Sequence, residues 1–365
     1  MKIAFVHDFL VQNGGAERVL RALHALWPEA PIYTIVHDKK RTHPDLQGKD
    51  IRPSFLQKMP FGLSHYQWFL PWMPRAIESH NLMEYDVVLS SSSAFAKGVI
   101  TGPRTLHICY CHTPTRYLWT DTHTYIRELA YNRLVKHIIP FLLTNLRLWD
   151  QMTAHRVDHF IANSKNVQER IKKYYRRESV VVHPPIDTSR FSLADRIENY
   201  YLIGGRLVSY KRYDLAVQAF SKMGIPLVVF GEGPEYARLQ AMAKPNVQFV
   251  GKVSDEELAR LYRHAIAFLH PQEEDLGLTA LEAMASGRPV IAYAKGGALE
   301  TVVPGVTGTF FEEQTWESLA DTVLHFNPLA YDAKKIRAHA EQFDVQKFQA
   351  QVKGFVENAW ESFRK

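Results

Sequence analysis

Cysteine is scarce in this chain of 365 residues. Its two cysteines, Cys109 and Cys111, flank a single tyrosine, which places them too close for an easy disulfide. There is no second pair of cysteines to complete a zinc site. We therefore expect a protein that needs no oxidising compartment.

Long hydrophobic runs are also missing. No stretch reaches the roughly 18 uninterrupted apolar residues that cross a bilayer, because a proline, an asparagine and an arginine interrupt even region 138–148. The apolar run Met1–Val6 ends at His7 and Asp8, which indicates a buried strand rather than a signal peptide. We expect a cytoplasmic protein that does not span a membrane.

The dinucleotide fingerprint Gly-x-Gly-x-x-Gly does not follow this first strand, which disfavours an NAD-dependent reductase. Its place is taken by the run Asn13-Gly14-Gly15-Ala16-Glu17. Paired glycines at a strand-to-helix turn let backbone amides approach a ligand, and a helix N-terminus favours anions. The same turn is often an ordinary tight connection, so both interpretations stay open.

Short apolar runs alternate with helical stretches along the whole chain, which is typical of parallel α/β domains. The first series of expected strands is 3–6, 33–36, 87–90, 107–110 and 159–162, and the second is 200–203, 226–230, 247–250, 266–269 and 289–293. The paired prolines in His183–Asp187 suit a stiff junction between the two series. We expect one domain at 1–190, a second at 191–344, and an amphipathic helix at 345–365 that returns to the first domain.

Charge is divided unevenly between the halves. Residues 1–190 hold 25 lysines and arginines against 16 acidic residues, a net +9, whereas residues 191–365 hold 19 against 22, a net −3. A basic first half suits nucleic acid or an anionic membrane surface, but an ordinary solvated surface gives the same count. Charge alone does not decide among these partners.

Two cations flank a short loop in the second half. Arg206 and Lys211 lie between an expected strand and a helix that begins near Tyr213. They could converge on one anion such as a diphosphate, the arginine as a fork and the lysine as a point charge. Two solvated surface cations are the alternative.

Two carboxylates lie eight positions apart in the segment His270–Val290. Glu274 falls in a loop, and Glu282 falls in a helix expected to begin near Leu278 and to stop at Gly287. The free amides at the start of that helix would face a phosphate at the carboxyl edge of the sheet. The two carboxylates suit sugar and ribose hydroxyls.

These residues resemble a known enzyme family. Glu274 and Glu282 match the Glu-x7-Glu motif of retaining glycosyltransferases with the GT-B fold, in surroundings typical of glycosyltransferase family 4. Further segments that look like that family are Asn163-Ser164, Pro185–Asp187, Gly205–Leu207, Gly231–Pro234, Ala283–Val290 and Gly296–Glu300. One departure is Asp275-Leu276, where the family usually has Gly-Phe. The resemblance implies two Rossmann-like domains facing across a cleft.

The resemblance also implies which residues hold the donor. They are Gly14, Gly15, Gly205, Arg206, Lys211, Glu274, Gly277, Leu278, Thr279 and Glu282. By analogy, Arg206 and Lys211 hold the diphosphate, Glu282 binds the ribose and Glu274 binds the transferred hexose. His112 matches the family's active-site histidine beside the donor sugar, although a lone histidine is more often a structural hydrogen-bonding residue.

We expect no metal and no other cofactor, because no two aspartates are spaced as Asp-x-Asp, the metal signal of the other large glycosyltransferase fold. The resemblance implies retention of the anomeric configuration. The runs 90–98 and 109–117 look like bacterial mannosyltransferases of O-antigen or capsular polysaccharide synthesis. GDP-mannose is therefore the expected donor, ahead of UDP-glucose or another hexose donor, with a glycan or lipid-linked acceptor.

Other functions remain as alternatives. A GT-B fold also suits an epimerase or a hydrolase of sugar nucleotides, or a nucleotide-sugar-binding protein without activity. Nucleic-acid binding rests on basic charge alone, and we do not expect it. The basic first half, the aromatic run Tyr66–Met73 and the apolar run Ile138–Leu143 together predict peripheral docking on the inner face of an anionic membrane.

Overall fold

The computed structural model describes residues 1–120, 122, 126 and 133–365, which divide into two compact units. The first unit comprises Met1–His183 with Gln349–Lys365, and the second comprises Pro184–Phe348. The first break precedes the predicted boundary at residue 190, because Ile186 already pairs with Asp344 of the second unit. The second break falls inside the last helix.

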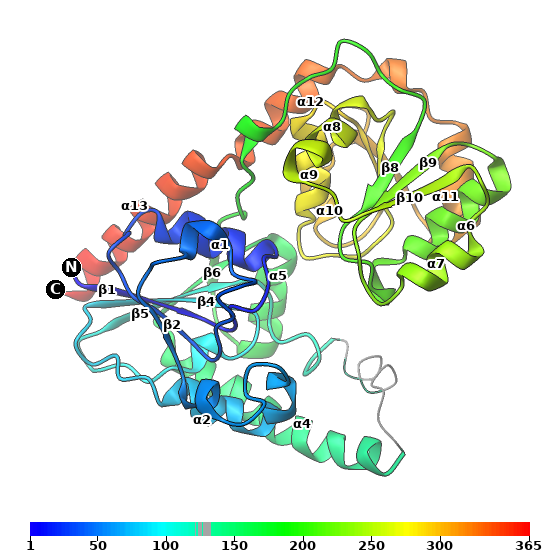
Figure 1. The fold of residues 1–365 in the computed structure, drawn as a ribbon. Helices are drawn as coiled ribbons and strands as arrows, with labels where there is room; N and C mark the ends of the chain where they lie inside the picture. The colour runs from blue at the N-terminus through cyan, green and yellow to red at the C-terminus, as the bar shows by residue number, and fades with distance from the viewer. Residues whose placement is uncertain (121, 123–125, 127–132) are drawn as a thin grey trace. The chain divides into compact units, whose positions relative to one another are not determined.

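A parallel sheet of seven strands forms the centre of the first unit, in the order β3-β2-β1-β4-β5-β6-β7 (Figure 1). The strands are β1 Ile3–His7, β2 Ile32–Thr34, β3 Ile51–Pro53, β4 Val87–Ser92, β5 Leu106–Cys111, β6 His159–Ala162 and β7 Ser179–Val181. Every residue of β1, β4 and β5 is buried, as central strands covered on both faces require.

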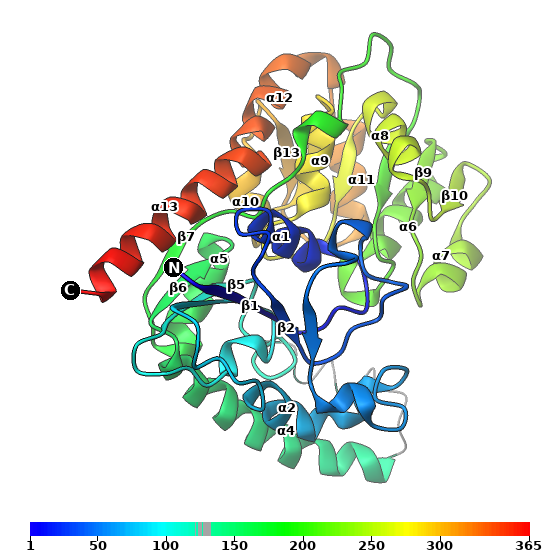
Figure 2. The same ribbon diagram turned by 60° about the vertical axis from the view of Figure 1, so that its left-hand side comes forward.

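Helices cover both faces of this sheet (Figures 1 and 2). They are α1 Gly15–His24, α2 Met73–Glu78, α4 Arg133–Thr153 and α5 Lys165–Arg170, with α13 Val345–Phe363 shared between the units. As expected, α13 returns to the first unit, where the Gln349 side chain donates a 2.9 Å hydrogen bond to the carbonyl of Ala22 in α1. The Phe355 ring packs edge-on against His159 of β6.

The second unit repeats the architecture with a parallel sheet in the order β10-β9-β8-β11-β12-β13. Its strands are β8 Tyr201–Gly204, β9 Leu227–Phe230, β10 Val247–Gly251, β11 Phe268–His270, β12 Val290–Tyr293 and β13 Gly308–Phe311. Its helices are α6 Tyr213–Met223, α7 Tyr236–Met242, α8 Asp255–His264, α9 Leu278–Ala285, α10 Ala298–Thr301, α11 Trp316–Leu324 and α12 Ala333–Ala340. The fold is therefore α/β with two Rossmann-like sheets, as the sequence predicted.

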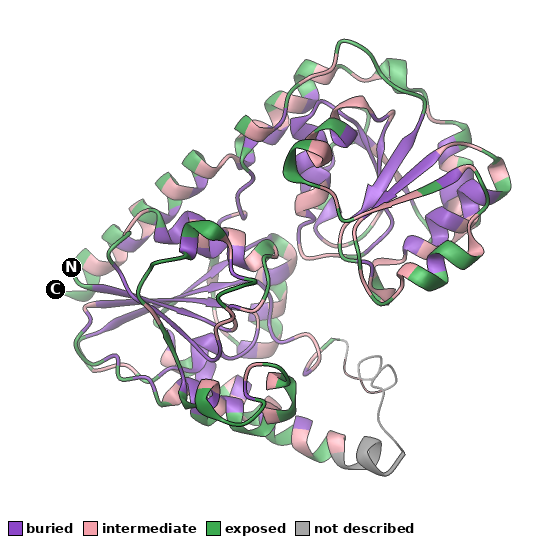
Figure 3. Cartoon of the chain, in the orientation of Figure 1, coloured by how far each residue is buried: buried purple, intermediate pink, exposed green. Residues whose placement is uncertain are grey.

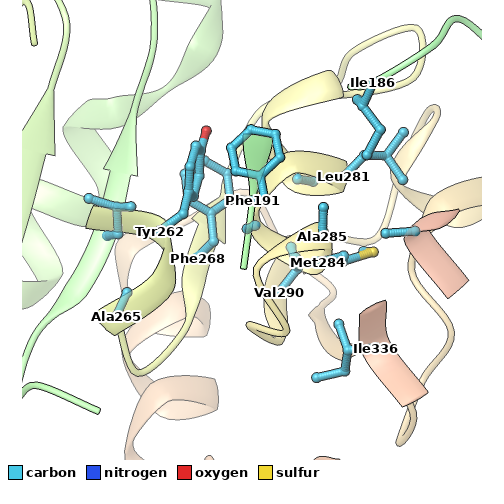
Figure 4. Close-up of a cluster of buried hydrophobic side chains, with 14 of the residues drawn as sticks. Ile186, Phe191, Tyr262, Ala265, Phe268, Leu281, Met284, Ala285, Val290 and Ile336 are labelled. Atoms are coloured by element: carbon cyan, nitrogen blue, oxygen red, sulfur yellow. The ribbon is translucent and has the colours of Figure 1, made fainter. Parts of the chain in front are cut away.

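Each face of the second sheet packs against its own apolar core. One core packs α8, α9 and α12 on the sheet and contains Phe191, Tyr262, Phe268 and Met284 (Figure 4). The other lies under α6 and α11. Burial follows these layers, with the strands buried and the outer surfaces of the helices exposed (Figure 3). Such two-sided burial makes the sheet a rigid base for the loops at its carboxyl edge.

Each of the ten predicted strands forms, and no end is displaced by more than two residues. The sequence missed β3, β7 and β13, which are edge strands of three or four residues with partly exposed side chains. Their partly exposed side chains interrupt the apolar run by which a buried strand is detected. Within the described ranges, no helix is both long and apolar enough to cross a membrane.

Candidate active site

An ion pair joins two loops at the carboxyl edge of the second sheet. Lys211 ends a 3₁₀ turn after β8, Glu274 lies in the loop after β11, and their Nζ and Oε1 atoms are 2.9 Å apart. The lysine and glutamate side chains are only 12% and 17% exposed. Burial lowers the pKa of Lys211, but Glu274 more than offsets this effect, so the pKa lies above its ordinary value.

Gly205 makes room for this pair. Its φ is +131°, and a Cβ atom there would lie 3.0 Å from the Tyr213 hydroxyl and 3.6 Å from Lys211 Nζ. The Thr279 methyl is within 4.0 Å of the same point, so β8, the 3₁₀ turn and α9 meet around this glycine. The Tyr213 hydroxyl donates a 2.9 Å hydrogen bond to the carbonyl of Gly204, which fixes its position. A side chain larger than glycine would fill the space beside the ammonium group.

Helix α9 points its N-terminus into the same region. Gly277 caps it with φ +93°, and a Cβ atom at this position would collide with the His270 ring at 2.8 Å. The amides of Leu278 and Thr279 follow directly and have no intrahelical carbonyl partner, as in the first turn of any α-helix. These amides and the helix dipole favour a bound anion.

Three buried polar atoms around the start of α9 lack a hydrogen-bond partner among the described residues. They are Nε2 of His270, Oε1 of Gln272 and Oγ1 of Thr279. Burial lowers the pKa of His270 to about 4, so the ring is neutral at pH 7, and its Nδ1 lies 3.1 Å from Gln272 Nε2. Buried polar atoms without partners mark places where a group from outside the chain can bind.

Two further predicted residues of the second unit, Glu282 and Arg206, differ in exposure. Glu282 is 4% exposed on α9 and accepts a 3.1 Å hydrogen bond from the Tyr262 hydroxyl. The side chain of Arg206 is exposed beside Gly205, and no described contact joins it to Lys211. The structure thus brings together Lys211 and Glu274, whereas the convergence of Arg206 on the same anion stays a prediction.

His112 lies at the carboxyl edge of the first sheet, directly after β5. It is 8% exposed, and its Nε2 lies 2.8 Å from the hydroxyl of Ser91 in β4. That hydroxyl is also 3.1 Å from Nδ1 of His7 at the end of β1. Burial, with a smaller contribution from the charge of His7, lowers the pKa of His112 to about 3, so the ring is neutral at pH 7.

The paired glycines of the first unit form the start of α1. Gly14 is the N-cap residue, and its amide donates a 2.8 Å hydrogen bond to Glu17 Oε2. The amide of Gly14 therefore has a partner within the chain, while Gly15 is the first helical residue. The other carboxylate oxygen of Glu17 lies 3.9 Å from Nε2 of His7. Burial opposes ionisation of Glu17, but His7 and the Gly14 amide together keep its pKa below the ordinary value.

Two family models together match most of the chain and overlap at residues 185–190. The model described as Glycosyltransferase Family 4 matches residues 13–190, and the model described as Glycosyl transferases group 1 matches residues 185–342. Together they cover residues 13–342, which include every candidate site residue described above except His7. The chain belongs to glycosyltransferase family 4. Its two units are accordingly the two Rossmann-like domains of a GT-B protein.

Curated relatives of this family 4 glycosyltransferase have several activities. This chain is 28% identical over 222 residues to a D-inositol 3-phosphate glycosyltransferase of Mycobacterium marinum, and the match covers 53% of this chain and 47% of that protein. The chain thus spans about half the length of this relative. It is 26% identical to the α-1,3/1,6-mannosyltransferase ALG2 of Candida glabrata over 83% of this chain and 78% of that protein. It is 34% identical to a GDP-mannose-dependent α-mannosyltransferase of Corynebacterium glutamicum over 33% of this chain and 30% of that one.

Solved structures with the same fold are more distant in sequence. HepE of Anabaena, in complex with UDP and glucose, superposes with a TM-score of 0.73 at 18% identity, covering 98% of this chain and 100% of HepE. This similarity confirms the two-domain α/β fold and leaves the donor open.

The sequence of this glycosyltransferase did not by itself predict roles for His7, Ser91 and Glu17, or for His270 and Gln272. A signal was present, because His7 and His270 are the last residues of strands and Ser91 is the penultimate residue of β4. Functional groups of open parallel sheets gather at that edge. The parts of the chain that the structure describes contain no cluster of three or more histidine, cysteine or acidic side chains suited to a metal ion. Independence from metals remains a prediction to be tested.

Proposed function

We propose that the protein is a retaining hexosyltransferase that transfers mannose from GDP-mannose to a glycan or lipid-linked glycan acceptor in bacterial surface polysaccharide synthesis. The observation that carries this proposal is the buried Lys211–Glu274 pair beside Gly205 and the N-terminus of α9. It combines a cation and free amides for a diphosphate with a carboxylate for sugar hydroxyls. The names of two mannosyltransferase relatives support mannose as the transferred sugar.

The chemistry follows from where charge develops. As the bond from the anomeric carbon to the diphosphate oxygen breaks, Lys211 and the amides of Leu278 and Thr279 stabilise the departing negative charge. A bond forms from the acceptor hydroxyl oxygen to the same face of the anomeric carbon, and the acceptor proton passes to a diphosphate oxygen. Glu274 holds hexose hydroxyls, Glu282 holds the ribose, and His112 binds the hexose from the first unit.

A donor screen tests this function. Purified protein is incubated with GDP-, UDP- and dTDP-sugars, with and without lipid-linked glycan, and released nucleotide is measured beside transferred sugar. We expect acceptor-dependent transfer from GDP-mannose, and NMR of the product should show the anomeric configuration of the donor. Turnover that needs no acceptor would identify a hydrolase or an epimerase, and binding without turnover would identify an inactive protein.

A UDP-hexose is the second candidate donor. It is favoured by the structural similarity to HepE, whose structure contains UDP and glucose. At 18% identity this similarity extends to the fold alone, so GDP-mannose stays the first choice. Transfer from UDP-glucose at a higher kcat/KM than from GDP-mannose would reverse the order.

We also propose that the first unit docks reversibly on an anionic membrane surface, where a lipid-linked acceptor is found. The 3₁₀ segment Tyr66–Trp72 has no buried residue, and Trp68 and Trp72 are 60% and 52% exposed. Phe69 and Leu70 of the same segment pack on the core, so the aromatic run divides between core and surface. In the second predicted run, Phe141 is 76% exposed, while the side chain of Ile138 lies outside the described residues.

Exposed tryptophans favour the membrane interface, and each cation near an anionic leaflet contributes about 1 kcal/mol. Sedimentation with vesicles that contain or lack anionic lipid, at low and high salt, tests docking. We expect salt-sensitive binding to anionic vesicles that weakens in Trp68→Ser and Trp72→Ser. The Leu329→Ser variant is the matched control, because Leu329 is an exposed apolar residue of the second unit. Equal partitioning with neutral vesicles would reject electrostatic docking.

A further inference from the structure

A chain of buried polar groups leads to His112 through three elements of the first unit. It runs from the Glu17 carboxylate in α1 to His7 in β1, then to Ser91 in β4, and ends at His112 Nε2 after β5. All four residues are at most 8% exposed. Three of them have no role in the transfer chemistry derived above.

Strand register explains why these side chains meet. His7 is the direct cross-strand partner of Ser91 in the parallel pair β1 and β4, so both side chains point to the same face. Ser91 in turn pairs with Tyr110 of β5, and His112 lies two residues further along, which returns its side chain to that face. The arrangement is therefore set by the central strands of the sheet rather than by a mobile loop.

The bridging hydroxyl imposes a chemical constraint. A serine has one hydrogen to donate, so Ser91 can donate to only one of the two imidazole nitrogens that face it. The other nitrogen must then carry a hydrogen and donate to the serine oxygen. Satisfying both hydrogen bonds requires one protonated and one bare nitrogen among His7 Nδ1 and His112 Nε2. The tautomers of the two histidines are thereby coupled.

Glu17 biases this coupling. Its carboxylate lies 3.9 Å from His7 Nε2, on the side of the ring opposite Ser91, and favours a hydrogen on that nitrogen. It is held in place by the Gly14 amide. If only Nε2 of His7 carries a hydrogen, the bare Nδ1 accepts from Ser91, and Ser91 accepts from His112 Nε2. If both nitrogens of His7 carry one, Nδ1 donates to Ser91, and Ser91 donates to His112 Nε2. Because the His112 ring is neutral, its Nδ1 has the opposite state to its Nε2.

We infer that Glu17, His7 and Ser91 are positioning residues that set which ring nitrogen of His112 carries the hydrogen. The consequence for catalysis rests on the proposed function. A hydrogen on Nδ1 makes His112 a donor to an oxygen of the transferred sugar, whereas a bare Nδ1 makes it an acceptor for a sugar hydroxyl. The three residues thus determine which sugar group His112 can recognise.

The neighbouring serine provides a matched control. Ser90 is also buried, and its hydroxyl lies 2.9 Å from Nε2 of the buried His107. It precedes Ser91 by one residue in β4 and so points to the opposite face of the sheet. Replacing Ser90 removes a serine–histidine hydrogen bond of similar length and burial without touching His112.

The test is ¹⁵N NMR of histidine-labelled protein at pH 7 without substrate, with the His112 signals assigned by their loss in His112→Gln. We expect Ser91→Ala and Glu17→Gln to change the tautomer ratio of His112, Ser91→Thr to restore it, and Ser90→Ala to leave it unchanged. Thermal unfolding of each variant confirms that it is folded. If Ser91→Ala does not fold, Glu17→Gln, which keeps the side-chain size, decides the question.

Kinetics give the second readout. We expect Ser91→Ala to lower kcat of sugar transfer about tenfold, the value of one hydrogen bond lost in the transition state, while Ser90→Ala keeps the wild-type value. Unchanged His112 tautomers in both Ser91→Ala and Glu17→Gln would overturn the inference. The NMR result needs no donor or acceptor, so it remains decisive even if the protein proves not to be a transferase.

Discussion

Lys211 and Glu274 neutralise each other at 2.9 Å across two loops of the second unit. Burial lowers the pKa of this lysine, but Glu274 more than offsets the effect, so the ammonium group stays charged. In the proposed function, an incoming diphosphate adds negative charge on one side of the ammonium, and Glu274 accepts hydrogen bonds from sugar hydroxyls. In the proposed function, the ion pair therefore holds two groups ready for a sugar nucleotide, the ammonium for the diphosphate and the carboxylate for hydroxyls.

Removing the ammonium group should disable transfer. We expect Lys211→Ala to lower kcat/KM by about a hundredfold to a thousandfold, because the developing diphosphate charge loses a buried cation. The measurement is steady-state transfer with the donor found in the screen. Lys244→Ala, at an exposed lysine of the same unit, is the control and should behave as wild type. Wild-type turnover by Lys211→Ala would show that another group holds the diphosphate.

Activity should survive excess chelator. The cation of Lys211 and the free amides of α9 supply the charge stabilisation that a divalent ion supplies in metal-dependent transferases. Transfer is measured after incubation with EDTA and again after addition of magnesium or manganese. Abolition by EDTA and recovery with either metal would refute this prediction.

Asp8 should be essential for the stability of the first unit. Its carboxylate accepts four backbone hydrogen bonds of 2.6–3.0 Å, from the amides of Ser93, Ala94, Phe95 and Ala96. Asp8→Ala leaves these amides without their acceptor, and we expect a loss of about 3 kcal/mol or more in the free energy of unfolding. Urea denaturation measures the loss. Glu169→Ala, at an exposed acid of the same unit, should change stability by less than about 0.5 kcal/mol.

A fully buried ion pair gives a second stability prediction. Lys97 Nζ and Asp150 Oδ1 are 2.5 Å apart, with both side chains at most 1% exposed. Asp150 also accepts hydrogen bonds from Thr115 and Trp119. Lys97→Met should lower the free energy of unfolding by about 3–5 kcal/mol, because it leaves the Asp150 carboxylate buried without its cation. The double variant Lys97→Met/Asp150→Leu should lose less than the sum of the two single variants. If denaturant titrations show that the losses of the two single variants add up to the loss of the double variant, the two residues are not energetically coupled.

Stability should fall in mild acid. Burial lowers the pKa of His80, His107 and His270 to about 4 and that of His112 to about 3, below the ordinary value near 6.5. Between pH 6.5 and about 4, these histidines bind protons in the unfolded chain but not in the folded chain. Their contribution to the free energy of unfolding is therefore fully present above pH 6.5 and is lost as the pH falls toward 4. Each histidine contributes up to about 1.4 kcal/mol per pH unit within that window. Thermal unfolding between pH 4 and 7.5 checks this trend, and His80→Gln should reduce its slope.

The sequence by itself determined the repeated α/β architecture, since each central strand has a continuous apolar run that is visible within a few residues. It also determined that three candidate site residues of the second unit lie close together. Glu274, Gly277 and Glu282 belong to one strand–loop–helix unit, so their spacing along the chain almost fixes their spacing in space. The pairing of Lys211 with Glu274 was not predicted, because it joins loops after β8 and β11 that are distant in the chain.

The tertiary structure alone decided the contacts that depend on register between distant strands. His7 and Ser91 are 84 residues apart, and Lys97 and Asp150 are 53 apart, so no local periodicity encodes either contact. A shift of one residue in the pairing of β1 and β4 would turn Ser91 away from His7. Packing of the whole sheet selects that register, because it must bury both faces at once. For this reason the residues that surround His112 emerged only from the folded chain.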